Sequence, residues 1–314
     1  MPKTRLSAVS RTQGNNRALK EGAVGLPDFE LDFEEVNPLP RAFRRMVREG
    51  AYDVSEMALT TFLCARAHGA PLTGLPIFLV RDFHHKSMAM NAAACLSGPK
   101  DLEGRRVGVM RGYTVTTGVW ARTILAEEHG VDLGQVTWAR SDDEHVASFV
   151  PPPNVEELGG EGSLEDQIRA GDPVAGVGLP AKGEGLVPVI ADPFEAGLAA
   201  CRDRGFYPIN HLVVVRDDVL AAHPGLADQL FDAFAASRDL YLADLAAGRI
   251  AEPAPTDRVH AAVSAAGHAP LPYGIAPNRA VLETLMAQAV AQRIVDAPIP
   301  LEDLFAPELH DRAA

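Results

Sequence analysis

The chain has 314 residues, of which 47% are hydrophobic and 23% are charged, a composition typical of a folded protein with one large or two ordinary domains. Its net charge of −13, from 29 basic and 42 acidic side chains, excludes the concentrated basic surface that nucleic-acid binding requires. No apolar run of about 18 residues occurs, so we expect no membrane-spanning segment and no membrane partner.

The beginning of the chain does not have the pattern of an export signal, because Arg11, Gln13, Asn15 and Asn16 interrupt its apolar residues. We therefore expect a cytoplasmic protein. The cysteines at positions 64, 95 and 201 share no metal-binding or redox spacing, and free thiols in a reducing compartment are expected.

Apolar periodicity and turn residues predict strands that alternate with helices along most of the chain. Strands are expected at residues 3–10, 29–36, 52–57, 75–80, 105–110, 174–179, 187–190 and 211–216. Helices are expected at residues 41–49, 59–67, 113–129, 163–170, 218–245 and 278–295, and a surface loop at residues 141–162. This alternation indicates an α/β fold with a mostly parallel sheet covered on both faces.

The same rhythm permits two α/β lobes. We expect residues 1–88 and 212–314 to form the first lobe and residues 89–211 the second, so that the chain crosses between them twice. The segment at residues 84–85 and the residue His211 would then lie near the two crossings, at a ligand cleft between the lobes.

The most distinctive segment begins where the strand at residues 75–80 ends. Five of the next six residues are ionisable: Arg81, Asp82, His84, His85 and Lys86. Open α/β sheets place their ligands at strand ends. Imidazoles that titrate near neutral pH, beside fixed positive charge, suit an anionic substrate that must gain or lose a proton.

A second candidate segment follows the expected strand at residues 105–110. A glycine turn leads there to Tyr113, Thr114, Thr116 and Thr117 at the start of a helix, where free amides and hydroxyls could hold a carboxylate. Ordinary N-capping by a threonine is the competing interpretation. The segment lacks the phosphate-loop and dinucleotide-binding motifs, so nucleotide binding is disfavoured.

Single residues elsewhere complete the candidate set. Glu56 follows a strand at the same expected sheet edge, Glu144 and His145 lie in the surface loop, and His211 opens an apolar strand. Arg11 ends the first strand as a candidate counter-ion. Each has a plainer alternative as a capping, solvated or structural hydrogen-bonding residue.

Metal and serine-hydrolase chemistry are not indicated. Adjacent histidines in a strand point to opposite faces, and no H-x-H or H-E-x-x-H spacing occurs, so no metal is expected at His84 and His85. No G-x-S-x-G motif is present.

Five segments, in order along the chain, carry a family resemblance. They are Tyr52-Asp-Val-Ser-Glu-Met57, Leu75-Pro-Ile-Phe-Leu-Val-Arg-Asp-Phe-His-His85, Asp101-Leu-Glu-Gly-Arg-Arg-Val-Gly-Val109, Asp143-Glu-His-Val146 and Phe206-Tyr-Pro-Ile-Asn-His-Leu-Val-Val-Val-Arg216. Together they resemble the 4,5-dihydroxyphthalate decarboxylase family, which is similar in turn to the type II periplasmic binding proteins. The resemblance implies a two-lobed type II periplasmic-binding-protein-like architecture with a ligand clamped between the lobes.

The resemblance also implies cofactor-independent decarboxylation of a hydroxylated aromatic carboxylic acid such as 4,5-dihydroxyphthalate. In that reaction His84 or His85 would protonate the ring, and His211 or the pair Glu144 and His145 would receive the phenolic proton. Six residues would hold carboxylate: Arg11, Arg81, Tyr113, Thr114, Thr116 and Thr117.

The alternative is a non-catalytic cytoplasmic solute-binding protein for a small aromatic or heteroaromatic anion. The sequence leaves open the substrate, the assistance of a divalent ion, which histidine is the acid, and the formation of a homo-oligomer.

Overall fold

The computed structural model describes residues 2–314, which divide into two compact units. Unit 1 contains residues 2–82, Ile209–Thr284 and Ile299–Ala314, and unit 2 contains Phe83–Pro208 and Leu285–Pro298. From the sequence we expected the chain to cross between the lobes after residues 88 and 211, and we expected residues 285–298 to lie in the first lobe. In the structure this last segment packs within unit 2, where Gln292 accepts a hydrogen bond from Arg122.

The sheet of unit 1 has five strands in the order β2-β1-β3-β11-β4 within the described residues. The strands are β1 (Thr4–Val9), β2 (Phe29–Glu34), β3 (Val54–Ala58), β4 (Leu72–Arg81) and β11 (Ile209–Arg216). β1 pairs in parallel with β2 and β3, whereas β11 lies antiparallel between β3 and β4. Four of the five strands therefore run in the same direction, as expected for a mostly parallel sheet, and the returning strand β11 runs in the opposite direction.

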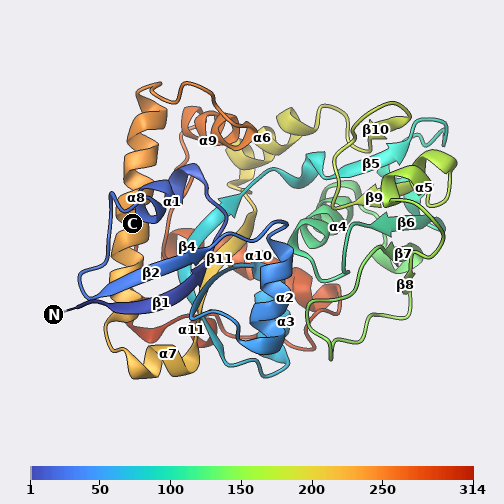
Figure 1. Cartoon of the computed structure of the whole chain (residues 1–314). Helices are drawn as coiled ribbons and strands as arrows, with labels where there is room; N and C mark the ends of the chain where they lie inside the picture. Colours follow the sequence, from blue (N-terminus) through green and yellow to red (C-terminus); the bar gives the residue numbers. More distant parts are fainter. Residues whose placement is uncertain (1) are drawn as a thin grey trace. The chain divides into compact units, whose positions relative to one another are not determined.

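Helices cover this sheet, and the long helix α8 provides much of the apolar core. Leu230, Phe231 and Phe234 of α8 belong to one buried cluster with Leu75 and Val213 of the sheet. Figure 1 shows α8 running beside α1, next to the strands. The helices of unit 1 are α1 (Gly14–Lys20), α2 (Pro40–Glu49), α3 (Leu59–Ala67), α7 (Asp217–Ala222), α8 (Leu226–Ala246), α9 (Pro255–Ala265) and α11 (Leu301–Leu304).

The sheet of unit 2 has six strands in the order β10-β5-β9-β6-β7-β8 within the described residues. They are β5 (Met88–Asn91), β6 (Arg106–Val109), β7 (Thr137–Arg140), β8 (Val155–Glu157), β9 (Ala175–Val177) and β10 (Leu186–Pro188). β9, β6, β7 and β8 run in parallel, and β5 and β10 are antiparallel additions at one edge. The helices are α4 (Thr116–His129), α5 (Leu164–Ala170), α6 (Pro193–Arg204) and the end of α10 (Arg279–Ala291).

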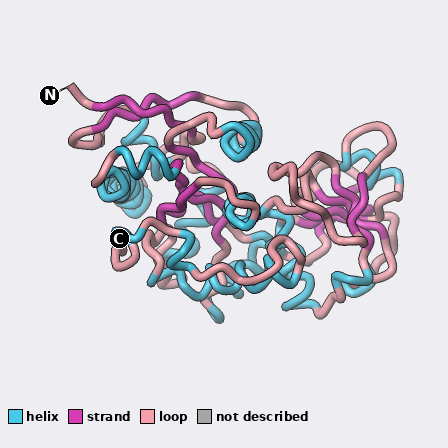
Figure 2. The backbone as a smooth tube through the Cα atoms, turned by 90° about the horizontal axis from the view of Figure 1, so that it is seen from below, coloured by secondary structure: helices cyan, strands magenta, loops and turns pink. Residues whose placement is uncertain are grey.

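The predicted α/β class is confirmed, and Figure 2 shows helices beside the strands of each unit. Short 3-10 turns join the elements: η1 (His84–Lys86), η2 (Pro99–Leu102), η3 (Leu133–Gln135), η4 (Ala276–Asn278) and η5 (Pro307–Leu309). The helical region expected at residues 218–245 is broken at residues 223–225, because Pro224 cannot donate a helical hydrogen bond and Gly225 has a left-handed backbone. β5, β7, β8, α1, α6, α9 and α11 were not predicted.

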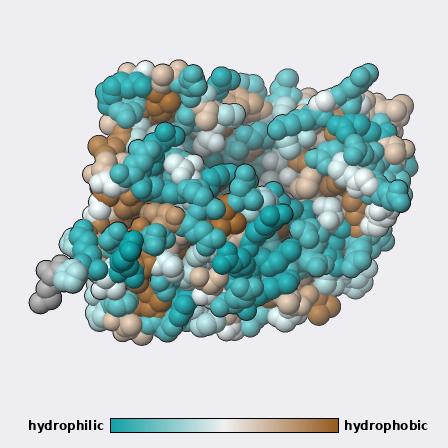
Figure 3. Space-filling model, viewed as in Figure 1, coloured by the Kyte–Doolittle hydropathy of each residue, from teal (hydrophilic) through white to brown (hydrophobic). Residues whose placement is uncertain are grey.

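The surface agrees with the acidic, polar composition. The face in Figure 3 is predominantly hydrophilic, with apolar residues scattered between polar ones. Among residues 2–314 the large apolar side chains that are exposed are Val150, Phe194 and Leu240.

Candidate active site

A carboxylate and an imidazole from two neighbouring strands of unit 1 form a short hydrogen bond. Glu56 lies on β3 and His211 on β11, where the antiparallel register sets Val213 opposite Glu56 and His211 opposite Ala58. Because side chains alternate across a strand, positions 56 and 211 share one face as diagonal neighbours. The atoms Glu56 Oε1 and His211 Nδ1 are 2.6 Å apart.

The buried Glu56 carboxylate is satisfied on its other oxygen as well. Oε2 accepts hydrogen bonds from the Ser10 hydroxyl at 2.8 Å and from the Arg11 amide at 3.0 Å. Burial raises the pKa of Glu56, but the hydrogen bond and charge of His211, the charge of Arg11 and the Ser10 hydroxyl lower it further, so the net pKa is below its usual value. The carboxylate is therefore ionised at neutral pH.

This carboxylate determines what the His211 ring presents. An ionised carboxylate only accepts, so Nδ1 carries the proton and Nε2 of the neutral ring is left as a proton acceptor. The His211 side chain is 16% exposed, whereas that of Glu56 is 0% exposed. Phe43 packs edge-on against the imidazole with ring centroids 5.2 Å apart and restricts its orientation.

The two candidate arginines of unit 1 differ in how strongly they are engaged. Arg81 is buried at the end of β4 and donates from Nη1 to Asn278 Oδ1 at 2.7 Å. The Arg11 side chain is exposed, and its hydrogen bond to Gln13 Oε1 is long at 3.4 Å. Arg11 is thus the more available cation beside Glu56 and His211.

In unit 2, His84 and His85 follow the end of strand β4, as the sequence indicated. They form the 3-10 turn η1, closed by a 2.9 Å hydrogen bond from the Ser87 amide to the His84 carbonyl. Both rings are buried, and His85 Nε2 lies 2.9 Å from Glu128 Oε2 on α4. Burial raises the pKa of Glu128, but His85 and an ion pair with Arg204 lower it further, so the net pKa is below its usual value.

The expected carboxylate cradle is occupied by a carboxylate of the protein itself. Glu144 accepts hydrogen bonds from the Tyr113 amide at 2.6 Å, the Thr114 amide at 3.0 Å and the Thr114 hydroxyl at 2.7 Å. Helix α4 then begins at Thr116, and its N-cap residue is Val115, not a threonine. Tyr113, Thr114 and Glu144 are thus brought together, with Thr116 and Thr117 in the following helical turn and His145 buried next to Glu144.

Sequence reasoning missed a buried arginine that supports this loop. Arg122 is fully buried on α4 and donates from Nη2 to the Tyr113 carbonyl at 2.7 Å and from Nε to Gln292 Oε1 at 2.8 Å. Burial lowers its pKa. Gly118, one helical turn earlier, leaves room for the guanidinium, because a Cβ there would lie 3.3 Å from Nη1. An arginine in a helix ordinarily indicates solvent exposure, so glycine at that spacing was the available signal.

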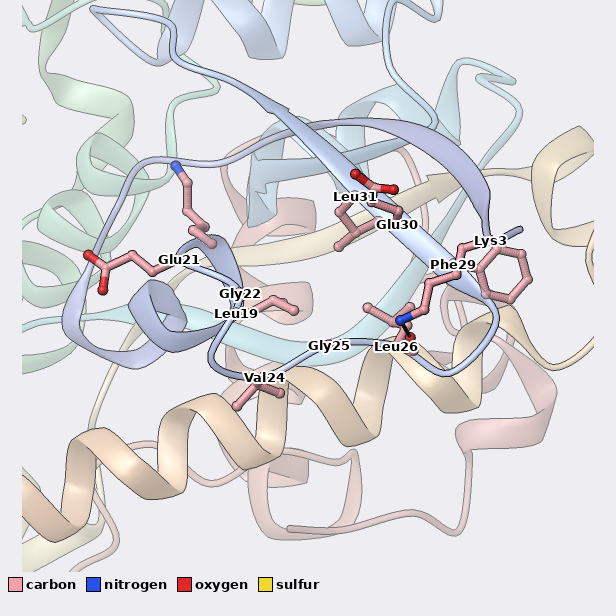
Figure 4. Close-up of a pocket in the computed structure, with 11 residues that line it drawn as sticks. Lys3, Leu19, Glu21, Gly22, Val24, Gly25, Leu26, Phe29, Glu30 and Leu31 are labelled. Carbon is pink, nitrogen blue, oxygen red and sulfur yellow. Dashed lines mark hydrogen bonds between the residues drawn. The ribbon is translucent and has the colours of Figure 1, made fainter. Parts of the chain in front are cut away.

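A pocket of about 520 Å³ in unit 1 lies away from these residues. Figure 4 shows it between the end of α1, the following loop and β2, with Leu19, Val24 and Leu26 on its wall and Lys3 donating to the Leu26 carbonyl. Its lining contains no histidine. It therefore lacks a side chain suited to proton transfer at neutral pH.

The described residues contain neither a cluster of metal-binding side chains nor a helix that could span a membrane. Among residues 2–314, no group of three or more His, Cys, Asp or Glu side chains is arranged to hold a metal ion. No helix formed by residues 2–314 is long and apolar enough to span a bilayer.

Comparison with known proteins was made at the level of sequence and of structure. No family model matches the chain. It is 28% identical to a protein from Comamonas testosteroni named 4,5-dihydroxyphthalate decarboxylase, over 98% of both chains. It is 32% identical to a protein of the same name from Pseudomonas putida, over 46% of this chain and 56% of that one.

The solved structures that it resembles share its fold at low sequence identity. The desulfurization enzyme DSZB matches with a TM-score of 0.57 and 16% identity, over 98% of both chains. The periplasmic sulfonate-binding protein SsuA from Methylobacillus flagellatus matches with a TM-score of 0.52 and 12% identity, over 98% of this chain and 92% of that one. The periplasmic-binding-protein-like α/β fold is therefore confirmed. The resemblance of this chain to the 4,5-dihydroxyphthalate decarboxylases, first indicated by five short segments, is confirmed as well and extends over nearly its whole length.

Proposed function

We propose that the protein is a carboxy-lyase that removes CO₂ from a hydroxylated aromatic carboxylic acid such as 4,5-dihydroxyphthalate, without a cofactor. The observation that carries this proposal is the similarity over 98% of the chain to a protein with that decarboxylase name. The pair formed by Glu56 and His211 supports it, because it supplies a positioned proton acceptor.

The chemistry requires one proton to leave a hydroxyl and one to arrive at the ring. Loss of the phenolic proton para to a carboxylate lets the ring carbon that bears this carboxylate take up a proton and form a new C–H bond. The C–C bond to the carboxylate then breaks, its electron pair restores the aromatic ring and leaves the negative charge on the oxygen, and CO₂ departs. The oxygen then takes back the proton that it gave up. The net reaction consumes one proton and needs no oxidant or reductant.

In this proposal His211 Nε2 accepts the phenolic proton, and Glu56 holds the ring by Nδ1 and faces the positive charge that forms. Arg11 provides positive charge for a substrate carboxylate, and of the two adjacent histidines His84 is the acid that protonates the ring, because Glu128 holds the His85 ring. Positioned acid–base catalysis of this kind contributes roughly 10²–10⁴-fold to a rate.

The test combines product analysis with matched histidine variants. With 4,5-dihydroxyphthalate the purified protein is expected to release CO₂ and form 3,4-dihydroxybenzoate, measured by chromatography. In D₂O, deuterium should appear at the ring carbon that lost the carboxylate. His211→Gln should lower kcat strongly, and His268→Gln, which alters a histidine assigned no role, should not. Saturable binding without CO₂ release would contradict the proposal and favour a binding protein.

A further inference from the structure

An arginine in unit 2 adopts a backbone conformation that its position in the fold does not require. Arg111 has φ of 69°, in the left-handed region that side chains other than glycine, asparagine and aspartate rarely adopt. Arg293 has φ of 56°, but it follows α10, where its amide and that of Ile294 close the helix end onto Val290 and Ala289. Arg111 ends no helix, so another reason must favour an arginine there.

The backbone of Arg111 is fixed at the carboxyl end of the parallel strands. It comes two residues after β6, and its amide donates to Ser141 Oγ at 2.8 Å while its carbonyl accepts from the Ser141 amide at 3.1 Å. Ser141 itself directly follows β7. Two neighbouring strand ends thus fix the direction in which this residue leaves the sheet, at the edge where such sheets place ligands.

The Arg111 guanidinium is not paired with any described carboxylate, unlike those of two arginines on strands of this sheet. Arg106 pairs with Glu156, and Arg140 pairs with Asp143 and Glu157. The Arg111 guanidinium makes no hydrogen bond or ion pair with any of residues 2–314, although the charge of Asp142 acts on it. Surrounding protein desolvates the group enough to lower its pKa, and the side chain remains accessible.

We propose that Arg111 is a specificity-determining residue, which binds the substrate carboxylate that is not lost as CO₂. The inference rests on the proposed function and assigns a residue to the carboxylate that the product keeps. A guanidinium on the departing carboxylate would stabilise the charged ground state and oppose its conversion to neutral CO₂. The same group on the retained carboxylate keeps its bidentate contact throughout the reaction.

The test uses phthalate as the probe, because it carries both carboxylates but no hydroxyl and is not turned over by this mechanism. By isothermal titration calorimetry, Arg111→Gly should raise the Kd for phthalate about 10- to 100-fold, and Arg111→Lys should give a smaller increase. Arg293→Gly removes the same charge at the same kind of backbone position and should leave the Kd unchanged. Thermal unfolding of Arg111→Gly should show an unchanged or higher Tm, because glycine relieves the left-handed backbone.

The outcomes separate this inference from the proposed function. Equal Kd values for phthalate in wild type and Arg111→Gly, or no binding of phthalate by the wild type, would overturn it even if CO₂ release from 4,5-dihydroxyphthalate were intact. Loss of phthalate binding in Arg111→Gly alone would support it, even if no aromatic acid were decarboxylated.

Discussion

Each unit contains an imidazole paired with a glutamate, and the two pairs differ in which side chain is exposed to solvent. In unit 1 the Glu56 side chain is 0% exposed and that of His211 is 16% exposed. In unit 2 the His85 side chain is 1% exposed and that of Glu128 is 18% exposed. Solvent therefore reaches the imidazole in the first pair and the carboxylate in the second pair.

This difference in exposure is the reason for proposing proton transfer at His211 and a structural role at His85. A histidine acts as an acid or base when a buried partner fixes one ring nitrogen and the other can reach a ligand. Glu56 does this for His211, whereas Glu128 is also bound by Arg204 and holds His85 inside the unit. The proposed function therefore assigns proton transfer to the pair in unit 1 and a structural role to the pair in unit 2.

The largest expected effect is on turnover. His211→Gln should lower kcat for 4,5-dihydroxyphthalate by roughly 10²–10⁴-fold, because glutamine can still donate to Glu56 but cannot accept and release the proton. The matched variant His85→Gln tests the other pair. Steady-state kinetics that showed the larger loss of kcat in His85→Gln would reverse the comparison.

The second expected effect is on stability. Glu56→Ala should lower the free energy of unfolding by about 3 kcal/mol, because it leaves the Ser10 hydroxyl, the Arg11 amide and the His211 ring without a buried acceptor. Glu128→Ala should cost only about 1 kcal/mol, because water can reach that position. Urea unfolding at pH 7 measures both, and equal losses would remove the distinction.

A third histidine, His260, is expected to set the pH dependence of stability. Among the described residues it makes no hydrogen bond to a carboxylate. His260 is buried against the Tyr241 hydroxyl at 2.8 Å, and burial lowers its pKa from 6.5 to about 4. The unfolded chain binds a proton here between these values and the folded chain does not, so stability should fall by about 3 kcal/mol as pH drops from 6.5 to 4.

The two glutamates, Glu56 and Glu128, affect stability at lower pH than His260 does. Their pKa values in the folded protein are lower than the usual 4.5, so the stability they contribute is present above pH 4.5 and is lost as pH falls through the lowered values. His260→Gln should therefore remove the slope between pH 6.5 and 4 in urea unfolding and leave the acid limb. A slope unchanged in this variant would assign it to other groups.

The smallest expected effect concerns the carboxylate held by backbone amides instead of an imidazole. Glu144→Gln should lower the free energy of unfolding by about 1–2 kcal/mol, because the NH₂ group of the glutamine amide would face the N–H and O–H donors of Tyr113 and Thr114. Asp143→Asn, one residue earlier and exposed, is the control. Thermal unfolding in which both variants behaved alike would contradict this.

Most of the fold was predictable because its strands and helices are periodic over many residues. Residues 59–67 were predicted as a helix with the bounds that α3 has. β8 was missed because three residues after a proline run carry no period. β5 was missed because it follows the ionisable turn η1 directly.

The candidate residues were found singly, but their partnerships were not. Glu56 and His211 each stood out at a strand end, yet they meet only because β11 enters antiparallel beside β3 from 155 residues further along the chain. Glu144 was expected to handle protons, and its bond to the cradle depends on a loop without periodicity. Arg122 was missed because burial of an arginine depends on neighbours that are distant in sequence.

The insertion of β11 between β3 and β4 means that His211 is anchored on both flanks by strands of its own unit, with its carboxylate partner on one of them. The pair proposed to accept the phenolic proton is thus held inside one sheet and does not have to be assembled when a ligand arrives. Because Arg111, the residue proposed to bind the retained carboxylate, lies in unit 2, substitutions there are expected to change ligand binding without disturbing this pair.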